Sequence, residues 1–446
     1  MPSDLINIGR SGALAARAAL DVTAQNITNA NSEGYSRRSV ALAEVRSTGS
    51  VAYYSSSQLS GVRVEEFRRS DSIFLQNEAR RTGSDAARAD AELAGLRSGE
   101  QALEQAQIFP AIVEFEAALG QLRSDPLNEG ARAVVLENGR GLADSLRIAD
   151  SSLAASGEQI RGEAAAGVDR VNTAASELAR LNVALGKTQP GTTAQITLLD
   201  QRDAQLGRLS DEVGIAVSYE DNGTVSVQFG NNAGPTLVQN ATAGTLALTN
   251  NPDGTVAFTL DGAAADPITG GLAGKASALV EQRDLGAELD GLAAQIITAV
   301  NDAQANGTAP DGTAGQPFFS GSDAGTIGIA LSSGAGIATA PAGAPAGSRD
   351  TGNLDALRAS FATGGPPSEA NRILLELSST ISSRTVTRDA LATVAQSADS
   401  ALARETAVDL NEEATNLVRF QQAFQASGRI IQTASEIFNT VLGLGR

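Results

Sequence analysis

The chain has 446 residues, enough for roughly two to four domains, and it contains no Cys, His or Trp. These absences exclude disulfides, thiolate and Ser-His catalysis, and the commonest metal ligand. A net charge of −18 argues against nucleic acid as a partner. The composition therefore favours a structural or binding protein over an enzyme.

Charge is spread unevenly along the chain. The two ends, residues 1–45 and 401–446, together contribute −1, and residues 46–400 contribute the remaining −17. This asymmetry predicts ends that pack against other helices and a middle that faces water. Residues 1–12 lack the apolar core of a cleaved signal peptide, and no apolar run approaches the ~20 residues of a membrane span.

The first thirty residues are expected to form one helix. Apolar and small residues recur at steps of three and four, which is typical of a helix that packs along one seam. This N-terminal seam consists of Leu5, Ile8, Gly12, Ala15, Ala19 and Val22. Residues 26–35 then favour a turn, and Gly34 suits a left-handed helix stop.

In the middle of the chain, predicted strands and predicted helices alternate. Residues 40–45, 51–54 and 62–67 are predicted as short strands, and the Ala-, Glu-, Arg- and Leu-rich stretch 71–212 as long helices. Short strands follow at 215–219, 224–229, 236–238, 245–249 and 255–260, with Asp221-Asn222-Gly223 as a hairpin turn. Residues 276–306 return to helix. The Gly-, Ala- and Pro-rich stretch 307–352 is expected to be either a loop-rich surface region or a partly mobile one, with 326–331 as a candidate strand.

The chain ends in a second seam of apolar residues. From Ser368 onward an uninterrupted helical pattern is predicted, in which Leu410, Leu417, Phe424, Ile431 and Phe438 lie seven residues apart. Mainly small residues are expected at the alternate seam position, namely Ala414, Gln421, Gly428, Ser435 and Leu442. Large and small seams are complementary, so the two terminal helices are predicted to pair as a coiled coil.

Sequence motifs at both ends resemble those of bacterial flagellar axial proteins. Residues 11–16 read SGALAA, and Asn26, Asn29, Asn31, Gly34 and Tyr35 stand in a stretch similar to that family's NNIANxNTxGY. Residues 408–413 and 420–427 read VDLNEE and FQQAFQAS, similar to the family's C-terminal signature. In the interior, the stretches LLDQRD at 198–203 and DNG at 221–223 are similar to stretches in the hook-associated members of this axial family.

This resemblance implies a structural subunit that forms a ring on the hook tip and lets the filament grow from it. It implies as partners other copies of the chain, the hook protein, hook-associated protein 3, an export chaperone and the type III export apparatus. The location implied is extracellular, at the hook–filament junction, without a cleaved signal peptide. Both terminal seams would serve assembly, the chaperone would cover the C-terminal seam, and the turn motif would position the N-terminal arm.

The expected fold is mainly α with a smaller β part (α+β). We predict a terminal coiled-coil domain from 1–45 and 401–446, and a helical-bundle domain from 46–212, 271–306 and 361–400. Residues 213–270 would form an inserted β-rich outer domain, and residues 307–360 a Gly/Ala/Pro-rich loop region. No enzymatic activity, catalytic residue, cofactor or metal is expected.

Other interpretations of the same residues remain open. The seams could form a helical hairpin within an ordinary globular core. Asp200, Arg202 and Asp203 are interpreted as ion-paired structure rather than a catalytic site. Residues 270–276 lack the spacing of a phosphate loop. The alternative functions are a hook subunit of the same axial family, a surface adhesin, and a peptidoglycan-acting enzyme with paired carboxylates.

Overall fold

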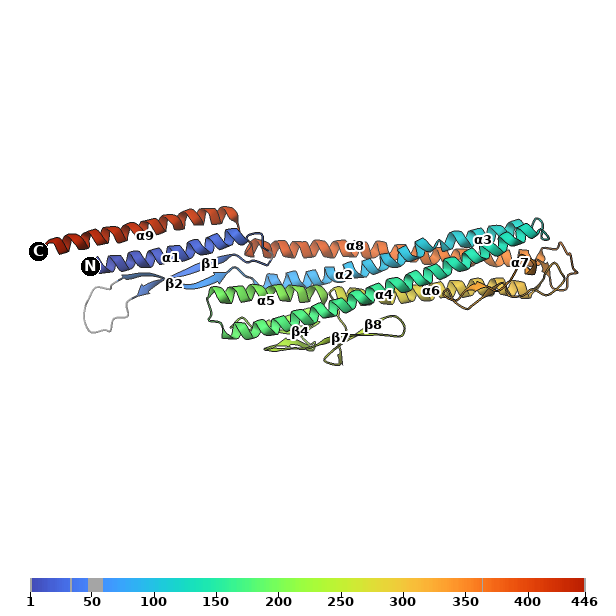
Figure 1. The fold of residues 1–446 in the computed structure, drawn as a ribbon, viewed down its shortest axis with the longest axis horizontal. Coiled ribbons are helices and arrows are strands. Elements are labelled where there is room, and N and C mark those ends of the chain that lie inside the picture. The colour runs from blue at the N-terminus through green and yellow to red at the C-terminus, as the bar shows by residue number, and fades with distance from the viewer. Residues whose placement is uncertain (1, 33, 47–58, 363, 445–446) are drawn as a thin grey trace. The chain divides into compact units, whose positions relative to one another are not determined.

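The computed structural model describes residues 2–32, 34–46, 59–362 and 364–444. Its described part is mainly helical with a smaller strand content, which confirms the predicted fold class. The chain divides into two compact units (Figure 1). Unit 1 contains residues 1–84, 170–245 and 392–446, and unit 2 contains residues 85–169 and 246–391. The four-part division expected from the sequence stays a prediction.

The helices follow the Ala-, Glu-, Arg- and Leu-rich stretches, as their intrinsic propensities favour. They are α1 (Pro2–Asn29), α2 (Ile73–Ala106), α3 (Ile108–Leu122), α4 (Glu129–Lys187), α5 (Thr193–Glu212), α6 (Gly271–Ala305), α7 (Gly352–Phe361), α8 (Pro366–Thr406) and α9 (Leu410–Leu444), with a short 3₁₀ turn at Gly334–Gly336. The helical stretch predicted at 71–212 is confirmed.

The single helix expected from Ser368 to the end is wrong, because the chain leaves helical geometry between Thr406 and Leu410. The carboxylate of Asp409 accepts hydrogen bonds from the backbone NH groups of Asn411 (2.8 Å) and Glu412 (3.3 Å). An N-cap of this kind satisfies NH groups that the first helical turn leaves unpaired. The start of α9 is therefore marked by the cap residue Asp409 and not by a proline or glycine.

The strands lie mostly where the alternating pattern predicts them. They are β1 (Arg38–Arg46), β2 (Leu59–Arg69), β3 (Ile215–Tyr219), β4 (Val225–Phe229), β5 (Thr236–Gln239), β6 (Thr242–Ala243), β7 (Leu246–Asn250), β8 (Val256–Leu260), β9 (Ala263–Ala264), β10 (Gly307–Thr308), β11 (Phe319–Ser320), β12 (Gly328–Ile329) and β13 (Ala340–Pro341). The strand predicted at 51–54 lies outside the described residues.

All strand pairs in the described part of the chain are antiparallel. In unit 1, β1 pairs with β2, and a four-stranded sheet has the order β3-β4-β5-β6. The predicted hairpin turn joins β3 to β4, where Gly223 has a φ of 85° and the side chain of Asn222 accepts from Thr224. In unit 2, β7, β8 and β9 form a three-stranded sheet.

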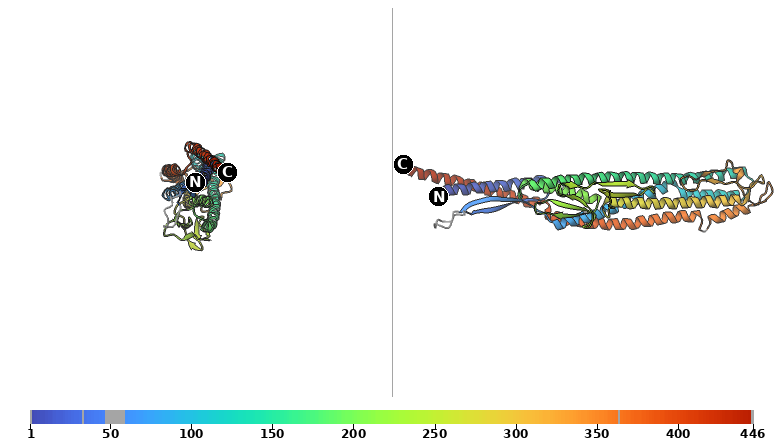
Figure 2. Two further views of the ribbon diagram at one scale, coloured as in Figure 1. Left: turned by 90° about the vertical axis from the view of Figure 1, so that its left-hand side faces the viewer. Right: turned by 90° about the horizontal axis from the view of Figure 1, so that it is seen from below.

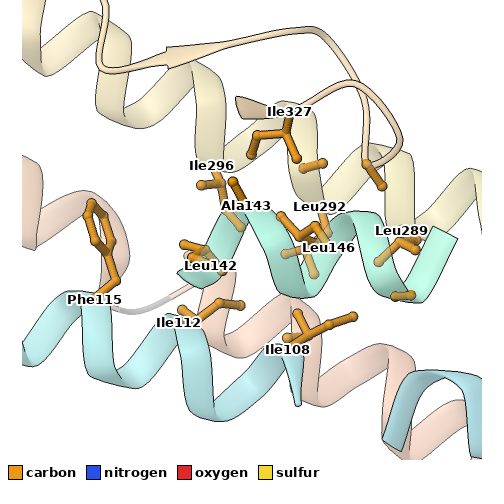
Figure 3. Packing of buried hydrophobic residues seen from close by; sticks show 14 of the residues in the cluster. Ile108, Ile112, Phe115, Leu142, Ala143, Leu146, Leu289, Leu292, Ile296 and Ile327 are labelled. Carbon is orange, nitrogen blue, oxygen red and sulfur yellow. The ribbon is translucent and has the colours of Figure 1, made fainter. Parts of the chain in front are cut away.

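Helices α3, α4 and α6 enclose the main core of unit 2 (Figure 3). Ile112, Phe115, Leu142 and Leu146 are fully buried there. Figure 3 shows Leu142 and Leu146 of α4 beside Leu292 and Ile296 of α6, with Ile112 of α3 next to Leu142. Their spacing of three and four residues gives each helix one apolar face, so the core follows from the sequence periodicity.

The Gly/Ala/Pro-rich stretch contributes to this core, contrary to the expected surface loop. Phe318 and Phe319 are each 1% exposed, and the ring centroid of Phe318 lies 5.6 Å from that of Phe115. The side chain of Asn301 accepts from the backbone NH groups of both phenylalanines. Apolar residues scattered among glycines were missed because they carry no periodic signal.

Buried Arg132 of α4 binds the Gly/Ala/Pro-rich stretch to this helix through hydrogen bonds. Its guanidinium donates to the carbonyl oxygens of Pro126 and Ile337, both at 2.6 Å, and to Thr339 Oγ1 at 3.0 Å. Burial lowers the pKa of Arg132 to about 10, so the group still carries its charge at neutral pH. Carbonyl dipoles in place of a carboxylate stabilise this charge.

Candidate assembly site

The terminal helices α1 and α9 lie side by side and antiparallel, as the views in Figure 1 and Figure 2 agree. Glycines of α1 allow the close approach. A Cβ atom on Gly9 would stand 2.7 Å from Ile431 Cγ1, and one on Gly12 would stand 2.8 Å from Ser427 Oγ. The two terminal helices therefore approach each other closely at small residues, as the seam pattern predicts. That the pair supercoils as a coiled coil stays a prediction.

The predicted N-terminal seam divides along the length of α1. Ala15, Ala19 and Val22 are buried at 3–4% exposure, Ile8 and Gly12 are half-buried, and Leu5 is 42% exposed. Besides α9, α1 contacts β1 and β2, and the Val62 backbone NH of β2 donates to Ser11 Oγ of α1. The first turns of α1 thus leave apolar surface uncovered in the single chain.

The predicted C-terminal seam is only partly covered. Leu417 and Ile431 are half-buried, whereas Leu410, Phe424 and Phe438 are 51%, 45% and 46% exposed. An assembly or chaperone role for these five residues stays a prediction.

The alternate position of the C-terminal seam lies one residue earlier than expected. It consists of Glu413, Phe420, Ser427 and Ala434, and not of Ala414, Gln421, Gly428 and Ser435. Glu413 and Ala434 are 2% and 1% exposed, whereas a Cβ on Gly428 would meet no atom within 4 Å. The sequence pattern pointed to the smaller residues, whereas the buried carboxylate of Glu413 is paired with Arg37, a residue just before β1.

Asn26, in the last turn of α1, is the centre of the hydrogen bonds that hold the segment after this helix. Its side chain is fully buried, donates to the carbonyl oxygen of Arg38 (2.8 Å), and accepts from the Arg38 NH (3.0 Å) and the Tyr35 hydroxyl (2.9 Å). The Arg38 guanidinium also lies 4.9 Å from the centre of the Tyr35 ring. Burial raises the pKa of Tyr35, so the hydroxyl keeps its proton and remains a donor.

The other predicted motif residues act as turn chemistry. Gly34 has a φ of 73°, a left-handed conformation that favours glycine. Asn29 donates from its side chain to the Gln25 carbonyl at 3.0 Å, and its own carbonyl accepts from Ser32. Asn31 is exposed. The structure therefore brings Asn26 and Tyr35 together and leaves Asn31 at the surface.

Arg37 connects this turn to the beginning of α9. Its guanidinium contacts Glu413 at 2.8 Å and Glu412 at 2.6 Å, and its backbone NH donates to the Thr406 carbonyl. The acids stand at the N-terminus of α9, where negative charge is favourable. Although burial acts against it, the two carboxylates raise the pKa of Arg37. Sequence reasoning missed this pair, because nothing in the local pattern links residues so far apart.

A buried ion-pair network joins β1 and β2 to α5. Asp200 contacts Arg38 at 2.8 Å and Arg69 at 3.1 Å, and Asp203 contacts Arg69 at 2.6 Å and Arg202 at 2.7 Å. Burial raises the pKa of Asp200, opposed by the two arginines. The residues singled out as Asp200, Arg202 and Asp203 are thus ion-paired, as the sequence interpretation held.

Three observations bear on other kinds of site. A Cβ on Gly274 would lie 2.2 Å from the Arg88 carbonyl oxygen, so this glycine permits helix packing. Among the residues that the structure describes, no group of three or more Asp, Glu, His or Cys side chains is arranged to hold a metal ion. Nor does any helix in the described ranges have the length and apolarity to cross a bilayer.

Comparisons with known proteins match different parts of the chain. Residues 100–319 match the model of the "Flagellar hook-associated protein FlgK helical domain", and residues 404–444 match the "Flagellar basal body rod FlgEFG protein C-terminal". A solved structure, "The structure of the flagellar hook junction protein FlgK from Burkholderia pseudomallei", is 21% identical, with a TM-score of 0.48 over 55% of this chain and 46% of that one.

Relatives named "Flagellar hook-associated protein 1" occur in several bacteria. The Escherichia coli protein is 29% identical over 71% of this chain, and the Salmonella typhimurium protein matches equally well. The chain spans about 60% of their length, whereas it covers 98% of the Bacillus subtilis protein at 26% identity. The matched family is structural, in agreement with the prediction that the chain is not an enzyme. These comparisons confirm the resemblance of the chain to the flagellar hook-associated proteins of the axial family.

Proposed function

We propose that the chain is a subunit of the junction between hook and filament. Copies would assemble as a ring on the hook tip through α1 and α9, and the ring would provide the surface from which the filament grows. The relatives that bear the name hook-associated protein 1 support this role.

One observation carries the assembly part of the proposal. The α1–α9 pair exposes large apolar side chains on both helices, namely Leu5, Leu14, Leu410, Val418, Phe424, Ile430, Ile437 and Phe438. Many exposed large apolar side chains on one helix pair are typical of an interaction site. Each large side chain that a neighbour covers contributes about 1.5–3 kcal/mol.

The expected partners of the chain follow from its proposed position between hook and filament. We expect contacts with the hook protein on one side and hook-associated protein 3 on the other. Before assembly, an export chaperone would cover the exposed side chains of α9, and the type III export apparatus would deliver the chain outside the cell without a cleaved signal peptide.

Deletion of the gene tests the role directly. We expect cells with complete hooks and no filaments in electron micrographs, together with flagellin in the medium. Missing hooks would instead place the chain among hook or rod subunits. Normal filaments would overturn the junction role and leave an adhesin or a peptidoglycan-acting enzyme as alternatives. A complementing strain carrying the wild-type gene is the control.

A further inference from the structure

An apolar groove of about 440 Å³ lies within unit 2, where the chain passes from α2 to α3. Gln107 separates these two helices with a left-handed φ of 54°. The apolar side chains that line the groove come from α2, α3, α6 and α8, and include Leu103, Ile108, Leu289, Leu292, Ile373 and Leu374. Among the described residues that line it, none belongs to α4. The groove is therefore a concave apolar surface separate from the α1–α9 pair.

The α8 wall of this groove and α4 lie on opposite sides of unit 2. Gln282 of α6 donates to Ser156 of α4 at 2.7 Å, and Glu288 of the same α6 contacts Arg372 of α8 at 3.6 Å. Figure 2 agrees, since its right-hand view has α4 along one edge of this unit and α8 along the other, with α6 between them. A neighbour that meets α4 therefore leaves the α8 side free for another neighbour.

On its outer side, α4 exposes apolar residues in a row. Val134, Gly141 and Ile148 lie seven residues apart, which places them on one face of the helix. Val134 is 45% and Ile148 is 51% exposed, and a Cβ on Gly141 would meet no atom within 4 Å. Glycine inside a helix is destabilising relative to alanine, and no described residue packs closely enough to require it here. This face is therefore suited to the close approach of a partner surface.

Ile148 lies at the same level along the bundle as the groove. Leu146, two residues before it, packs in the core with Ile108 and Leu289 (Figure 3). Both of these partners also line the groove. An α-helix rises about 1.5 Å per residue, so Ile148 lies about 3 Å further along α4 than Leu146. Two copies side by side at equal height would therefore bring Ile148 of one copy to the groove of the other.

The charges at the two surfaces are complementary. Glu100 and Glu104, one helical turn apart on α2, line the groove. On α4, Arg147 stands next to Ile148, is 51% exposed, and forms an ion pair with Asp144 of its own helix. Exposed ion pairs within a helix contribute little to stability, so this guanidinium can turn toward a carboxylate of a neighbour.

We propose that the groove receives the side chain of Ile148 from α4 of a second copy of the chain, with Arg147 beside Glu100 and Glu104. The two surfaces differ and lie on opposite sides of one unit, so the contact is head-to-tail. Repeated head-to-tail contacts close into a ring when the rotation between copies divides a full turn. This inference rests on the proposed ring on the hook tip, and it names a lateral interface of that ring in addition to the α1–α9 surface.

Cross-linking tests the contact because the natural chain contains no cysteine. Ile148→Cys is made in one full-length copy and Glu104→Cys in a second copy that carries a mass tag. The two are mixed on isolated hooks and oxidised. We expect a mixed dimer of distinct mass, with a yield roughly tenfold above that of the control Ala154→Cys, an exposed residue on another face of α4. Equal yields in a mixture that binds hooks would overturn the proposal.

Charged side chains at position 148 provide a second, independent measurement. Ile148→Asp is expected to bind isolated hooks roughly tenfold more weakly than wild type, because it brings a negative charge to Glu100 and Glu104. Ile148→Lys should bind more tightly than Ile148→Asp, since its ammonium group would meet those carboxylates. The matched control Ala154→Asp should bind like wild type.

Two results would overturn this interface while leaving the junction role intact. One is unchanged hook binding of Ile148→Asp, and the other is an equal loss of binding with Asp and with Lys at this position. Failure of the wild-type chain to bind hooks at all would instead count against the junction role.

Discussion

At the scale of single residues, the terminal region is held by polar side chains that are buried and paired. Asn26 alone satisfies both backbone groups of Arg38 and the hydroxyl of Tyr35. Arg37 neutralises the buried Glu413. A complete buried pair of this kind adds only modestly to the free energy of unfolding, but removal of one partner lowers it strongly. Substitution of one partner is therefore informative.

Substitution of Asn26 by Ala should destabilise unit 1 by about 2–4 kcal/mol, because it leaves three buried polar groups without their partner. Urea unfolding followed by circular dichroism would measure this loss. The matched control is Asn31→Ala, at an exposed position of the turn that follows α1, which should change the free energy of unfolding by less than ~0.5 kcal/mol. Equal effects of the two substitutions would contradict the role assigned to Asn26, which is to hold Arg38 and Tyr35 by hydrogen bonds.

The Arg37–Glu413 pair should behave as a coupled unit. Arg37→Met leaves the buried carboxylate without a counter-charge and is expected to cost about 3–5 kcal/mol. The double variant Arg37→Met/Glu413→Leu should recover a substantial part of that loss. Glu412→Gln is the control, because this carboxylate is 54% exposed and its contact is worth at most ~1 kcal/mol. Additive effects in the double-mutant cycle would show that the pair is not coupled.

In unit 2, burial and the neighbouring carboxylates of Asp290 and Asp323 raise the pKa of Asp150. A carboxyl whose pKa is higher in the folded than in the unfolded state opposes folding once it is ionised. This penalty is relieved as the pH falls through the folded-state pKa. Asp150→Asn should therefore raise the melting temperature at pH 7, by an amount that shrinks toward pH 4. A gain that is constant with pH would exclude ionisation as its cause.

At the scale of elements, the sequence predicted which stretches are helices and strands better than where they begin. Periodicity identified the helices of 71–212 and the strands from Ile215 to Leu260, and it predicted that the two terminal helices lie together. The beginning of α9 at Leu410 and the alternate seam position escaped it, because a cap carboxylate and a distant arginine set them. Among the site residues, the turn motif was found from its composition, whereas Arg37 and Glu413 required the fold.

Close approach of α1 and α9 should depend on Gly9. In Gly9→Val the added atoms would meet Ile431 and the Ser427 carbonyl oxygen, so the pair should separate and the helical circular dichroism signal should fall. The control is Gly428→Ala in α9, where no atom lies within 4 Å of an added Cβ. Alanine should stabilise that helix by about 0.5–1 kcal/mol. Retained pairing in Gly9→Val would show that the glycine is not required.

At the scale of the whole molecule, the chain joins a well-buried helical core in unit 2 to a terminal helix pair with much apolar surface uncovered. The residues around Phe115 form a continuous core, whereas Leu5, Phe424 and Phe438 remain about half exposed. Ordering a backbone costs about 1–2 kcal/mol per residue, and sparse burial offsets little of it. Packing against neighbouring copies would supply the missing burial.

Hydrogen exchange should therefore divide the chain into slow and fast parts. In the isolated chain, amides of α1 between Leu5 and Val22 and those of α9 are expected to exchange orders of magnitude faster than amides around Phe115, because opening of the terminal pair exposes little additional apolar surface. On hooks, the same terminal amides should become protected while those of the core change little. Slow exchange across Leu5–Val22 in the isolated chain would mean that the α1–α9 pair is already stable before assembly. Assembly would then join preformed surfaces, and the exposed side chains of α9 would act as contacts only.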